Sequence, residues 1–424
     1  MITVRDGIFF LAGIPLCIVL LVVSVSAAEP EGLIASPEPG WPQWRGPKRD
    51  GVSTETGLLQ SWPEGGPKLL WTATDLGRGY SSPIIVGETI YITGDVGREL
   101  HIFALNLDGK LKWRAINGRA WARPYPGARG SCTYAGGRLF HMNAHGRLVC
   151  LDAGDGRDVW AVDVLDRFDG RNIQWGLAES VLVDGGRVYV TPGGRKGYMA
   201  ALDVKTGRTL WASRPVDRPG YASPILFRVG GRRLLVNLAH ESAVCIDAET
   251  GGVQWTWPKP SPYHSNSATP VSWKGHTFFT TPSGSGGLML RTILGKTGVR
   301  VEKGWDCRMD NISGGAVVVD GYLYGSGHYN TGWVCMDVRT GEVKYDSNAI
   351  SQGSVIYADD RLYCLSERGH IALVKPGPKS FEVTGKFRVP GSRGADVWTH
   401  PIVLDGRLYL RYHDRLHCYD VRRP

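Results

Sequence analysis

The clearest pattern in the sequence is a short phrase in which small and apolar residues alternate, followed by a polar turn and a final tryptophan. Copies span residues 104–113, 150–160, 201–211 and 245–255, and a fifth copy at 335–345 ends on tyrosine. The alternation before the turn is typical of a β-strand. In most copies the turn pairs Asp with Gly, since Asp bonds nearby backbone amides and Gly accepts a positive φ. The phrase therefore predicts two strands joined by a tight turn.

A second hairpin precedes the phrase in each repeat, as at residues 83–91, 181–189 and 317–324. Two hairpins supply four short antiparallel strands, and a period of roughly 40 to 50 residues indicates a propeller or a solenoid. We expect eight such repeats in an all-β protein, of which the fifth and seventh keep only the outline of the phrase, at 288–301 and 372–387. Their opening strands start near Ser82, Ser131, Ser180, Ser223, Thr269, Gly315, Ser354 and His400.

The two ends of the repeat region predict how the ring closes. The chain stops just after residues 418–421, which form the first half of the phrase, and a matching second half stands at 67–71. An N-terminal strand that completes the last blade closes the ring and leaves no bare sheet edge. The sequence thus favours a closed eight-bladed β-propeller over residues 67–424, with an open solenoid as the alternative.

The phrase resembles the tryptophan-docking motif of pyrroloquinoline-quinone (PQQ) type propellers over residues 67–421. The run WPQWRGPKRDGVS at 41–53 is similar to the leader of secreted bacterial PQQ-like repeat proteins. This family contains calcium- and quinone-dependent alcohol dehydrogenases, and also non-catalytic propellers such as the B subunit of the outer-membrane barrel-assembly machinery. The resemblance therefore implies the fold and leaves the function open. It implies docking positions at Trp71, Trp113, Trp160, Trp211, Trp255 and Tyr345.

The beginning of the chain indicates export. Arg5, the apolar stretch from Ile8 to Val25 and the small residues 26–28 are typical of a signal peptide. We predict a signal peptide at 1–28, a linker and N-terminal latch segment at 29–66, and a periplasmic or extracellular protein. An uncleaved membrane anchor is the alternative. Cys17 does not indicate a lipid anchor, because Leu16 precedes it where a lipidation site resembling the known pattern has a small residue.

The net charge of +9 does not point to a charged partner. Lys and Arg are scattered through turns without a run or a patch, so solvated turn residues explain them better than nucleic-acid binding does. Cys150, Cys245, Cys335 and Cys418 occupy the same small position of the phrase in separate repeats, too far apart for disulfides. We expect buried thiols, no nucleic-acid partner and a monomer.

The candidate functional residues lie just before the first strand of each blade. In a closed propeller that strand lines the central channel, so its entry loop faces one mouth of the channel. Polar and aromatic groups at equivalent positions around this ring are typical of a ligand-binding mouth. The alternative is a capping network in which Ser, Asn and Asp bond the loop backbone. The candidates are Arg129, Trp175, Glu179, Tyr221, His264, Asn266, Asp310, Asn311, Trp398 and His400.

Glu179, Asn266 and Asp310 offer the oxygen ligands that calcium prefers. In the quinone-dependent dehydrogenases a Glu, an Asn and a catalytic Asp, in this order, hold calcium against the cofactor. The resemblance then implies Asp310 as the general base and Trp175 or Trp398 as the residue that stacks on PQQ. Against this, the chain lacks the adjacent cysteine pair, the haem-attachment motif and the long insertions of those enzymes. The sequence therefore assigns no catalytic residue, and Asp310 has that role only under the quinoprotein alternative.

The sequence favours an exported, non-catalytic propeller that acts as an interaction or assembly scaffold for other envelope proteins, without a cofactor. A rigid ring with many exposed loops is the usual form of a docking platform. A calcium- and PQQ-dependent alcohol or sugar dehydrogenase is the main alternative. Carbohydrate binding on the aromatic faces of Trp175 and Trp398 is the second alternative.

Overall fold

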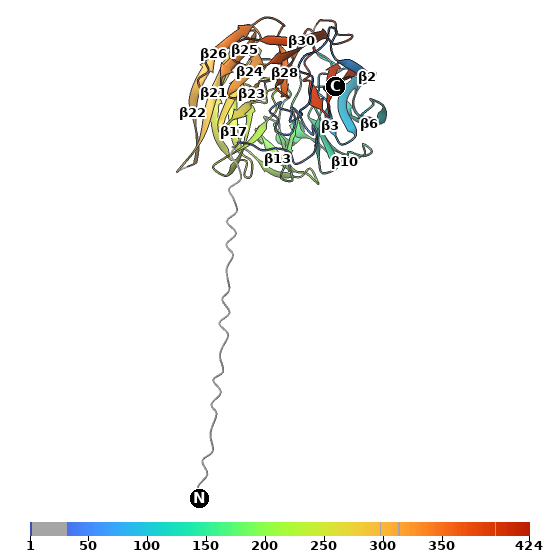
Figure 1. Ribbon diagram of the computed structural model, residues 1–424. Helices are drawn as coiled ribbons and strands as arrows, with labels where there is room; N and C mark the ends of the chain where they lie inside the picture. Colours follow the sequence, from blue (N-terminus) through green and yellow to red (C-terminus); the bar gives the residue numbers. More distant parts are fainter. Residues whose placement is uncertain (2–31, 297, 313, 395) are drawn as a thin grey trace. The chain divides into compact units, whose positions relative to one another are not determined.

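Eight antiparallel sheets make up the computed structural model of residues 32–424, and their colours follow the chain order around the ring (Figure 1). The predicted all-β, eight-bladed propeller is confirmed. The structure describes Met1 and residues 32–296, 298–312, 314–394 and 396–424, so the signal peptide predicted at 1–28 lies, apart from Met1, outside the described residues. In the part of the chain that is described, no helix has the length and apolar character needed to cross a membrane.

Each blade is a sheet of four strands, to which β1 (Gly32–Leu33) adds a fifth in blade four, and in blades one to seven the four strands are consecutive in the chain. Blades one to four consist of β3 (Ile84–Val86), β4 (Thr89–Val96), β5 (Glu99–Asn106) and β6 (Leu111–Arg119); β7 (Thr133–Ala135), β8 (Arg138–Met142), β9 (Arg147–Asp152) and β10 (Asp158–Asp163); β11 (Leu182–Asp184), β12 (Arg187–Val190), β13 (Ala200–Asp203) and β14 (Thr209–Ala212); and β15 (Ile225–Val229), β16 (Arg232–Leu238), β17 (Ser242–Asp247) and β18 (Val253–Pro258).

Blades five to eight consist of β19 (Val271–Trp273), β20 (His276–Thr280), β21 (Gly287–Gly295) and β22 (Gly298–Cys307); β23 (Val317–Val319), β24 (Tyr322–Ser326), β25 (Trp333–Asp337) and β26 (Val343–Ser347); β27 (Gly353–Ala358), β28 (Arg361–Ser366), β29 (His370–Lys375) and β30 (Glu382–Arg388); and β31 (Ile402–Leu404), β32 (Arg407–Tyr412), β33 (Arg415–Asp420) and β2 (Lys68–Ala73). β1 (Gly32–Leu33) adds a fifth strand beside β15. The described helical segments are α1 (Val164–Phe168) and the 3₁₀ turn η1 (Pro262–His264).

The last blade takes its outer strand from the N-terminal part of the chain, since β2 pairs antiparallel with β33. Contacts also join this blade to the first one. The backbone N–H of His400 donates to Ser82 Oγ at 2.8 Å, and the Arg411 guanidinium donates to the Ser81 carbonyl at 2.8 Å. Strand pairing and these hydrogen bonds link the two ends of the repeat region.

Tryptophans at the ends of outer strands pack on the neighbouring blade. The indole N–H of Trp113 donates to the Ala153 carbonyl at 3.2 Å, and a Cβ on Gly156 would lie 2.5 Å from the Trp113 ring. Gly156 also has a φ of 76°, so both its conformation and the close ring explain the Gly of the phrase. The same pair of contacts joins Trp71 to Gly109, Trp160 to Gly207 and Trp211 to Gly251.

Two of the predicted docking positions lack this hydrogen bond. Trp255 Nε1 and the Tyr345 hydroxyl are buried without a partner among the described residues. Each belongs to a blade whose next neighbour, blade five or blade seven, has an incomplete phrase, so no equivalent Gly turn receives the ring. The docking contact between blades five and six is made by Trp305 of the long hairpin β21–β22, with the Val338 carbonyl at 3.1 Å and against Gly341.

The described cysteines are free thiols, as their spacing led us to expect. Six of the seven are buried, and Cys307 is half-buried. Burial raises the pKa of the Cys150 thiol to about 12, which keeps it protonated at neutral pH.

Residues 41–53, which we call the channel plug, contact the innermost part of every blade. The contacts are Trp41 with Ile85, Pro42 with Tyr134, Arg49 with Val181 and Pro224, Trp44 with Thr269, Arg45 with Ala316, Val52 with Tyr357, and Ser53 with Val403. These partners lie in or beside the first strands of all eight blades. A short segment that meets all of them lies on the axis of the ring, and it closes the channel.

Candidate functional site

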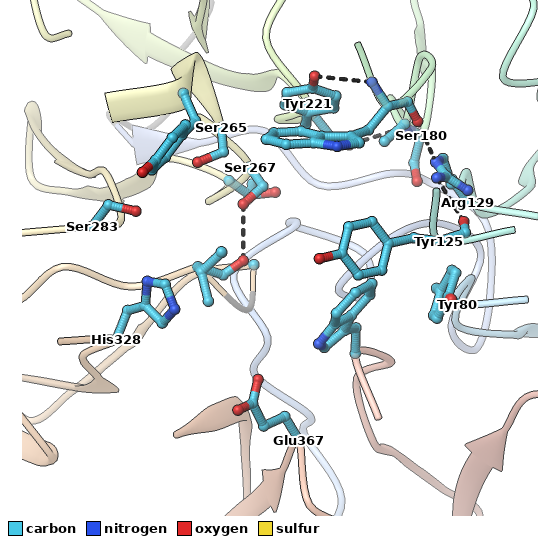
Figure 2. A pocket seen from close by; sticks show the side chains of 18 of the residues that line it. Tyr80, Tyr125, Arg129, Ser180, Tyr221, Ser265, Ser267, Ser283, His328 and Glu367 are labelled. Atoms are coloured by element: carbon cyan, nitrogen blue, oxygen red, sulfur yellow. Dashed lines mark hydrogen bonds between the residues drawn. The ribbon is translucent and has the colours of Figure 1, made fainter. Parts of the chain in front are cut away.

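A cavity of about 560 Å³ opens at one mouth of the channel (Figure 2). Loops of all eight blades contribute to its wall. The floor includes Trp44 of the channel plug, whose indole N–H donates to Thr269 Oγ1 at 2.8 Å. The lining consists of Trp44, Tyr80, Tyr125, Arg129, Trp175, Ala178, Ser180, Tyr221, Ser223, Tyr263, Ser265, Ser267, Thr269, Ser283, Ile312, Gly314, His328, Tyr329, Glu367 and Trp398.

Two groups of packed aromatic rings form one wall of the cavity. The ring centroids of Trp175 and Tyr221 are 5.5 Å apart, and the Trp398 ring lies 4.8 Å from Tyr80 and 5.2 Å from Tyr125. Tilted rings at these separations attract one another, and this attraction adds to the stabilisation that comes from their burial. Of the predicted mouth residues, Trp175, Tyr221 and Trp398 therefore lie together in this wall.

Arg129 holds the aromatic wall in place. Its Nε donates to the Trp175 carbonyl at 2.7 Å, its Nη1 to Gly127 at 2.6 Å and its Nη2 to Tyr125 at 2.8 Å. The guanidinium lies 5.2 Å from the centre of the Trp121 ring. Burial lowers the pKa of Arg129 to about 10, which leaves it charged at neutral pH. Each nitrogen of the guanidinium thus bonds a backbone carbonyl, and Arg129 positions the loops.

Polar side chains occupy the opposite side, where Figure 2 shows Ser265, Ser283 and His328 across from Tyr80 and Tyr125. These polar residues belong to entry loops and to the loops that join the second and third strands of a blade.

Glu367 contributes the one carboxylate among the described lining residues. Gln352 Nε2 donates to its Oε1 at 2.7 Å. Burial raises the pKa of Glu367, although an interaction with Trp398 acts to lower it.

Serines of the entry loops link adjacent blades below this wall. The N–H of Ser131 donates to Ser180 Oγ at 2.9 Å, and the N–H of Ser180 donates to Ser223 Oγ at 2.9 Å. Ser131 Oγ donates to the Ser82 carbonyl at 2.8 Å. Both interpretations of the entry loops therefore hold, because these serines bond backbone groups while the aromatic residues line the cavity, and Ser180 and Ser223 do both.

Asp310, a general base and metal ligand only under the quinoprotein alternative, is fully buried and bonded to backbone. Its two oxygens accept N–H groups from Gly284, His328 and Tyr329 at 2.9 Å each and from Asn330 at 3.1 Å. Four such bonds fill the roughly four lone-pair sites of a carboxylate. Asp310 thereby fixes two loops at the cavity mouth.

Asn266 is also fully buried. Its Nδ2 donates to the carbonyls of Ala239 at 2.8 Å and His240 at 3.0 Å, and its Oδ1 accepts from Ser261 Oγ at 2.7 Å. The side chain therefore ties the entry loop of blade five to blade four. Asn266 and Asp310 contact separate sets of neighbours.

Glu179, the third member of the calcium set, lies beneath the cavity and is 4% exposed. Burial raises its pKa to about 8, although hydrogen bonds with Thr191 and the charge of Arg49 act to lower it. A carboxyl with this pKa is mostly protonated at neutral pH. Its Oε1 has no hydrogen-bond partner among the described residues.

Glu179→Gln should leave stability unchanged in acid and raise it in alkali. The folded-state pKa of about 8 lies above the ordinary 4.5, so the proton stabilises the fold below pH 4.5 and this contribution is lost as pH rises through 8. Gln stays neutral, so the variant should gain up to about 4 kcal/mol over the native protein at pH 9. Thermal unfolding at pH 5, 7 and 9 measures this, with the exposed Glu88→Gln as control. A gap that does not widen with pH would contradict it.

Asn311 and His400 are buried structural residues. Asn311 Nδ2 donates to the Ser326 carbonyl at 2.8 Å, and its Oδ1 accepts the N–H of Gly315 at 3.0 Å. The His400 ring packs edge-on against Trp44, with centroids 4.5 Å apart. His400 thus supports the floor from below.

His264 lies at the rim, where its ring stacks on His240 at 3.9 Å. Its Nδ1 is 3.5 Å from Glu241, and ligand atoms of these three residues lie within 4.8 Å of one another. Arg218 Nη2 is 2.9 Å from His240 Nε2. A guanidinium in this position disfavours a metal ion by charge repulsion, so we assign no metal to the cluster.

Several lining residues were missed because the sequence analysis considered only entry loops. In each blade, the loop between the second and third strands reaches the same mouth as the entry loop. Tyr329 and Glu367 belong to such loops in blades six and seven. A search that included these loops would have found them. The only feature of the sequence that pointed to Trp44 was the resemblance of residues 41–53 to the leader of PQQ-like repeat proteins.

The family model described as outer membrane protein assembly factor BamB matches residues 98–292 and 229–380, which together span more than half of the chain. The chain belongs to this family of PQQ-like propellers. The match runs from the first blade into the seventh and so includes most of the ring.

Similar proteins in the family differ in function. A lanthanide-dependent methanol dehydrogenase of Methylacidiphilum fumariolicum is 31% identical over 156 residues, which are 34% of this chain and 25% of that protein. The outer membrane protein assembly factor BamB of Yersinia pestis is 22% identical over 263 residues, 57% of this chain and 62% of that protein. The chain thus covers less than two thirds of either relative. The crystal structure of BamB from Moraxella catarrhalis has a TM-score of 0.58 and 15% identity, over 84% of this chain and 98% of that chain, which supports the fold alone.

Proposed function

We propose that the protein is an exported, non-catalytic propeller that acts as a binding scaffold in the cell envelope, with the cavity mouth as its binding face. The observation that carries the proposal is the bonding of Asp310. A general base or calcium ligand needs a free lone pair, whereas this carboxylate accepts four backbone N–H groups. Removing those bonds would release the loops at residues 284 and 328–330 that form the mouth.

The rim of the cavity supports a binding role. Tyr263 and Tyr329 are each 72% exposed, and exposed tyrosines are typical of binding surfaces. Tyr125 and Tyr263 have φ values of 58° and 62°, a conformation that costs free energy for residues other than Gly. Such strain concentrates at binding sites. The similarity to an outer-membrane assembly factor covers a larger share of both chains than the similarity to the methanol dehydrogenase does. This difference agrees with a binding role.

A photo-crosslinking amino acid at Tyr263 or Tyr329 tests the scaffold directly. In cells that export the protein, both positions should give a discrete crosslinked product, because both face the mouth. Leu210, 41% exposed on the outer strand β14, is the matched control and should give none. Equal products at all three positions, or none at the mouth, would contradict the proposal.

A quinoprotein dehydrogenase is the second candidate, favoured by the similarity to the methanol dehydrogenase and by the unpartnered Glu179 oxygen. The residues present do not fit a calcium–PQQ centre, since the Asp310 oxygens accept backbone N–H groups, Asn266 Oδ1 accepts from Ser261 Oγ, and Arg129 is engaged with carbonyls. Titration with PQQ and calcium should therefore give no saturable change in cofactor absorbance and no alcohol-dependent dye reduction. Binding with dye reduction that is lost in Glu179→Gln would replace the scaffold with an oxidoreductase.

A further inference from the structure

We infer that the cavity binds the terminal rings of a neutral saccharide, stacked on its aromatic wall. This inference rests on the proposed function, in that it takes the mouth as a binding site without redox chemistry. It goes further by assigning the chemical class of the ligand. Three features of the cavity lead to it: the two-sided lining, the balance of charge and the closed floor.

The lining has the two kinds of surface that a sugar ring requires, with a further aromatic ring, Tyr329, stacked on His328 beside the polar groups. One face of a pyranose is apolar and packs on an aromatic ring, while its hydroxyls point outward to polar groups. Trp175 and Trp398 supply such rings in the described lining, and Ser265, Ser283 and Glu367 supply hydrogen-bonding groups on other sides. Sugar hydroxyls both donate and accept, which suits serine hydroxyls and a carboxylate equally.

The aromatic side is held in position before any ligand arrives. The backbone N–H of Trp175 donates to the Tyr221 hydroxyl at 3.3 Å, and Arg129 donates to the Trp175 backbone carbonyl. The Trp398 ring packs against the rings of both Tyr80 and Tyr125. Because these side chains are already ordered, binding costs little further conformational entropy.

The charge of the lining favours a neutral ligand. Among the described lining residues, Arg129 is the one Arg or Lys and Glu367 is the one Asp or Glu. Their formal charges therefore cancel. Each nitrogen of Arg129 already donates to a carbonyl, which leaves little to bind an anion such as PQQ. The same guanidinium lies 5.9 Å from the Tyr80 ring centre and so disfavours a second cation at this wall.

The floor limits how a saccharide enters. The channel plug closes the axis of the ring, and Trp44 lies at the bottom of the cavity. A volume of about 560 Å³ falls in the range of small-ligand pockets. A chain cannot pass through the ring, so the end of a glycan or a short oligosaccharide enters and the remainder stays outside.

Calorimetry and tryptophan fluorescence with linear oligosaccharides of glucose (α- and β-linked), mannose and N-acetylglucosamine test the inference on the full exported protein. At least one series should bind with one site per chain, and its trimer and hexamer should bind with nearly the same affinity. Trp175→Ala and Trp398→Ala should each weaken binding about tenfold, whereas Trp398→Tyr should retain part of the affinity. Trp273→Ala, a half-buried tryptophan at the turn of β19–β20, should bind normally.

Other outcomes overturn the inference in distinguishable ways. Binding of choline in place of every sugar would identify an aromatic cage for cations. No sugar binding at about 10 mM, well above a millimolar Kd, would reject the saccharide and leave the scaffold untouched. Affinity that rises steadily with chain length would place the glycan across the mouth instead of end-on in the cavity. Saturable PQQ binding with dye reduction would reject both the saccharide and the proposed function.

Discussion

Removing the channel plug should lower the melting temperature of the ring by at least about 10 °C, or prevent folding altogether. The plug buries Trp41 and the guanidinium groups of Arg45 and Arg49 among the first strands of eight blades. A chain that begins at residue 54 loses all of these contacts and leaves the channel open. Each unpaired buried carbonyl then costs about 1–3 kcal/mol unless water reaches it.

Three N-terminal truncations separate the plug from the closing strand. A chain that begins at Trp41 keeps both and serves as the control, a chain that begins at residue 54 lacks the plug, and one that begins at residue 74 also lacks β2. The last should be the least stable, because it exposes the edge of β33 and removes the Trp71 ring from Gly109. Calorimetric melting orders the three. Equal stability of the first two would show that the plug is passive, and equal stability of the last two would contradict closure through β2.

The repeat made the architecture predictable, because every complete phrase solves the same packing problem. A Trp ring needs a neighbour without a Cβ, so Gly recurs wherever the preceding blade ends on a docked Trp. The sequence analysis did not predict Trp305 as a docking residue, because the long hairpin β21–β22 changes its spacing from the start of the blade. Trp255 was assigned because it ends a complete copy of the phrase, but the following blade has no Gly turn to receive it.

The candidate site was predictable only as far as the ring geometry determines it. Entry loops of a propeller face the mouth, and on that basis Arg129, Trp175, Tyr221 and Trp398 were identified and do line the cavity. Which polar side chains turn inward to bond the backbone cannot be deduced from position in a loop. Asp310 illustrates this, since its four N–H partners come from two loops that lie 18 or more residues away in sequence.

Arg49→Met should destabilise the protein by about 3–5 kcal/mol, because it leaves several buried acceptors unpaired. Arg49 is 2% exposed and donates to the carbonyls of Ser180 at 3.0 Å and Pro224 at 2.9 Å, and to Gln43 Oε1 at 2.9 Å. Burial lowers the pKa of Arg49 to about 9, so it remains charged at neutral pH. Denaturant unfolding measures the loss. The exposed Arg157→Met is the control and should change stability by no more than about 0.5 kcal/mol.

Combining Arg49→Met with Glu179→Gln shows what the arginine does. If its main role is to join the plug to blades three and four, the two substitutions should be additive at pH 6, where the raised pKa of Glu179 keeps that carboxyl protonated. At pH 8 about half of Glu179 is ionised in the native protein while Arg49 is still mostly charged, so losing Arg49 also leaves a buried carboxylate without its nearby positive charge. Glu179→Gln should then rescue part of the Arg49→Met defect at pH 8 and not at pH 6. Rescue of equal size at both pH values would instead mean that Arg49 and Glu179 form an ion pair throughout, and that the plug is held by charge more than by hydrogen bonds to the carbonyls.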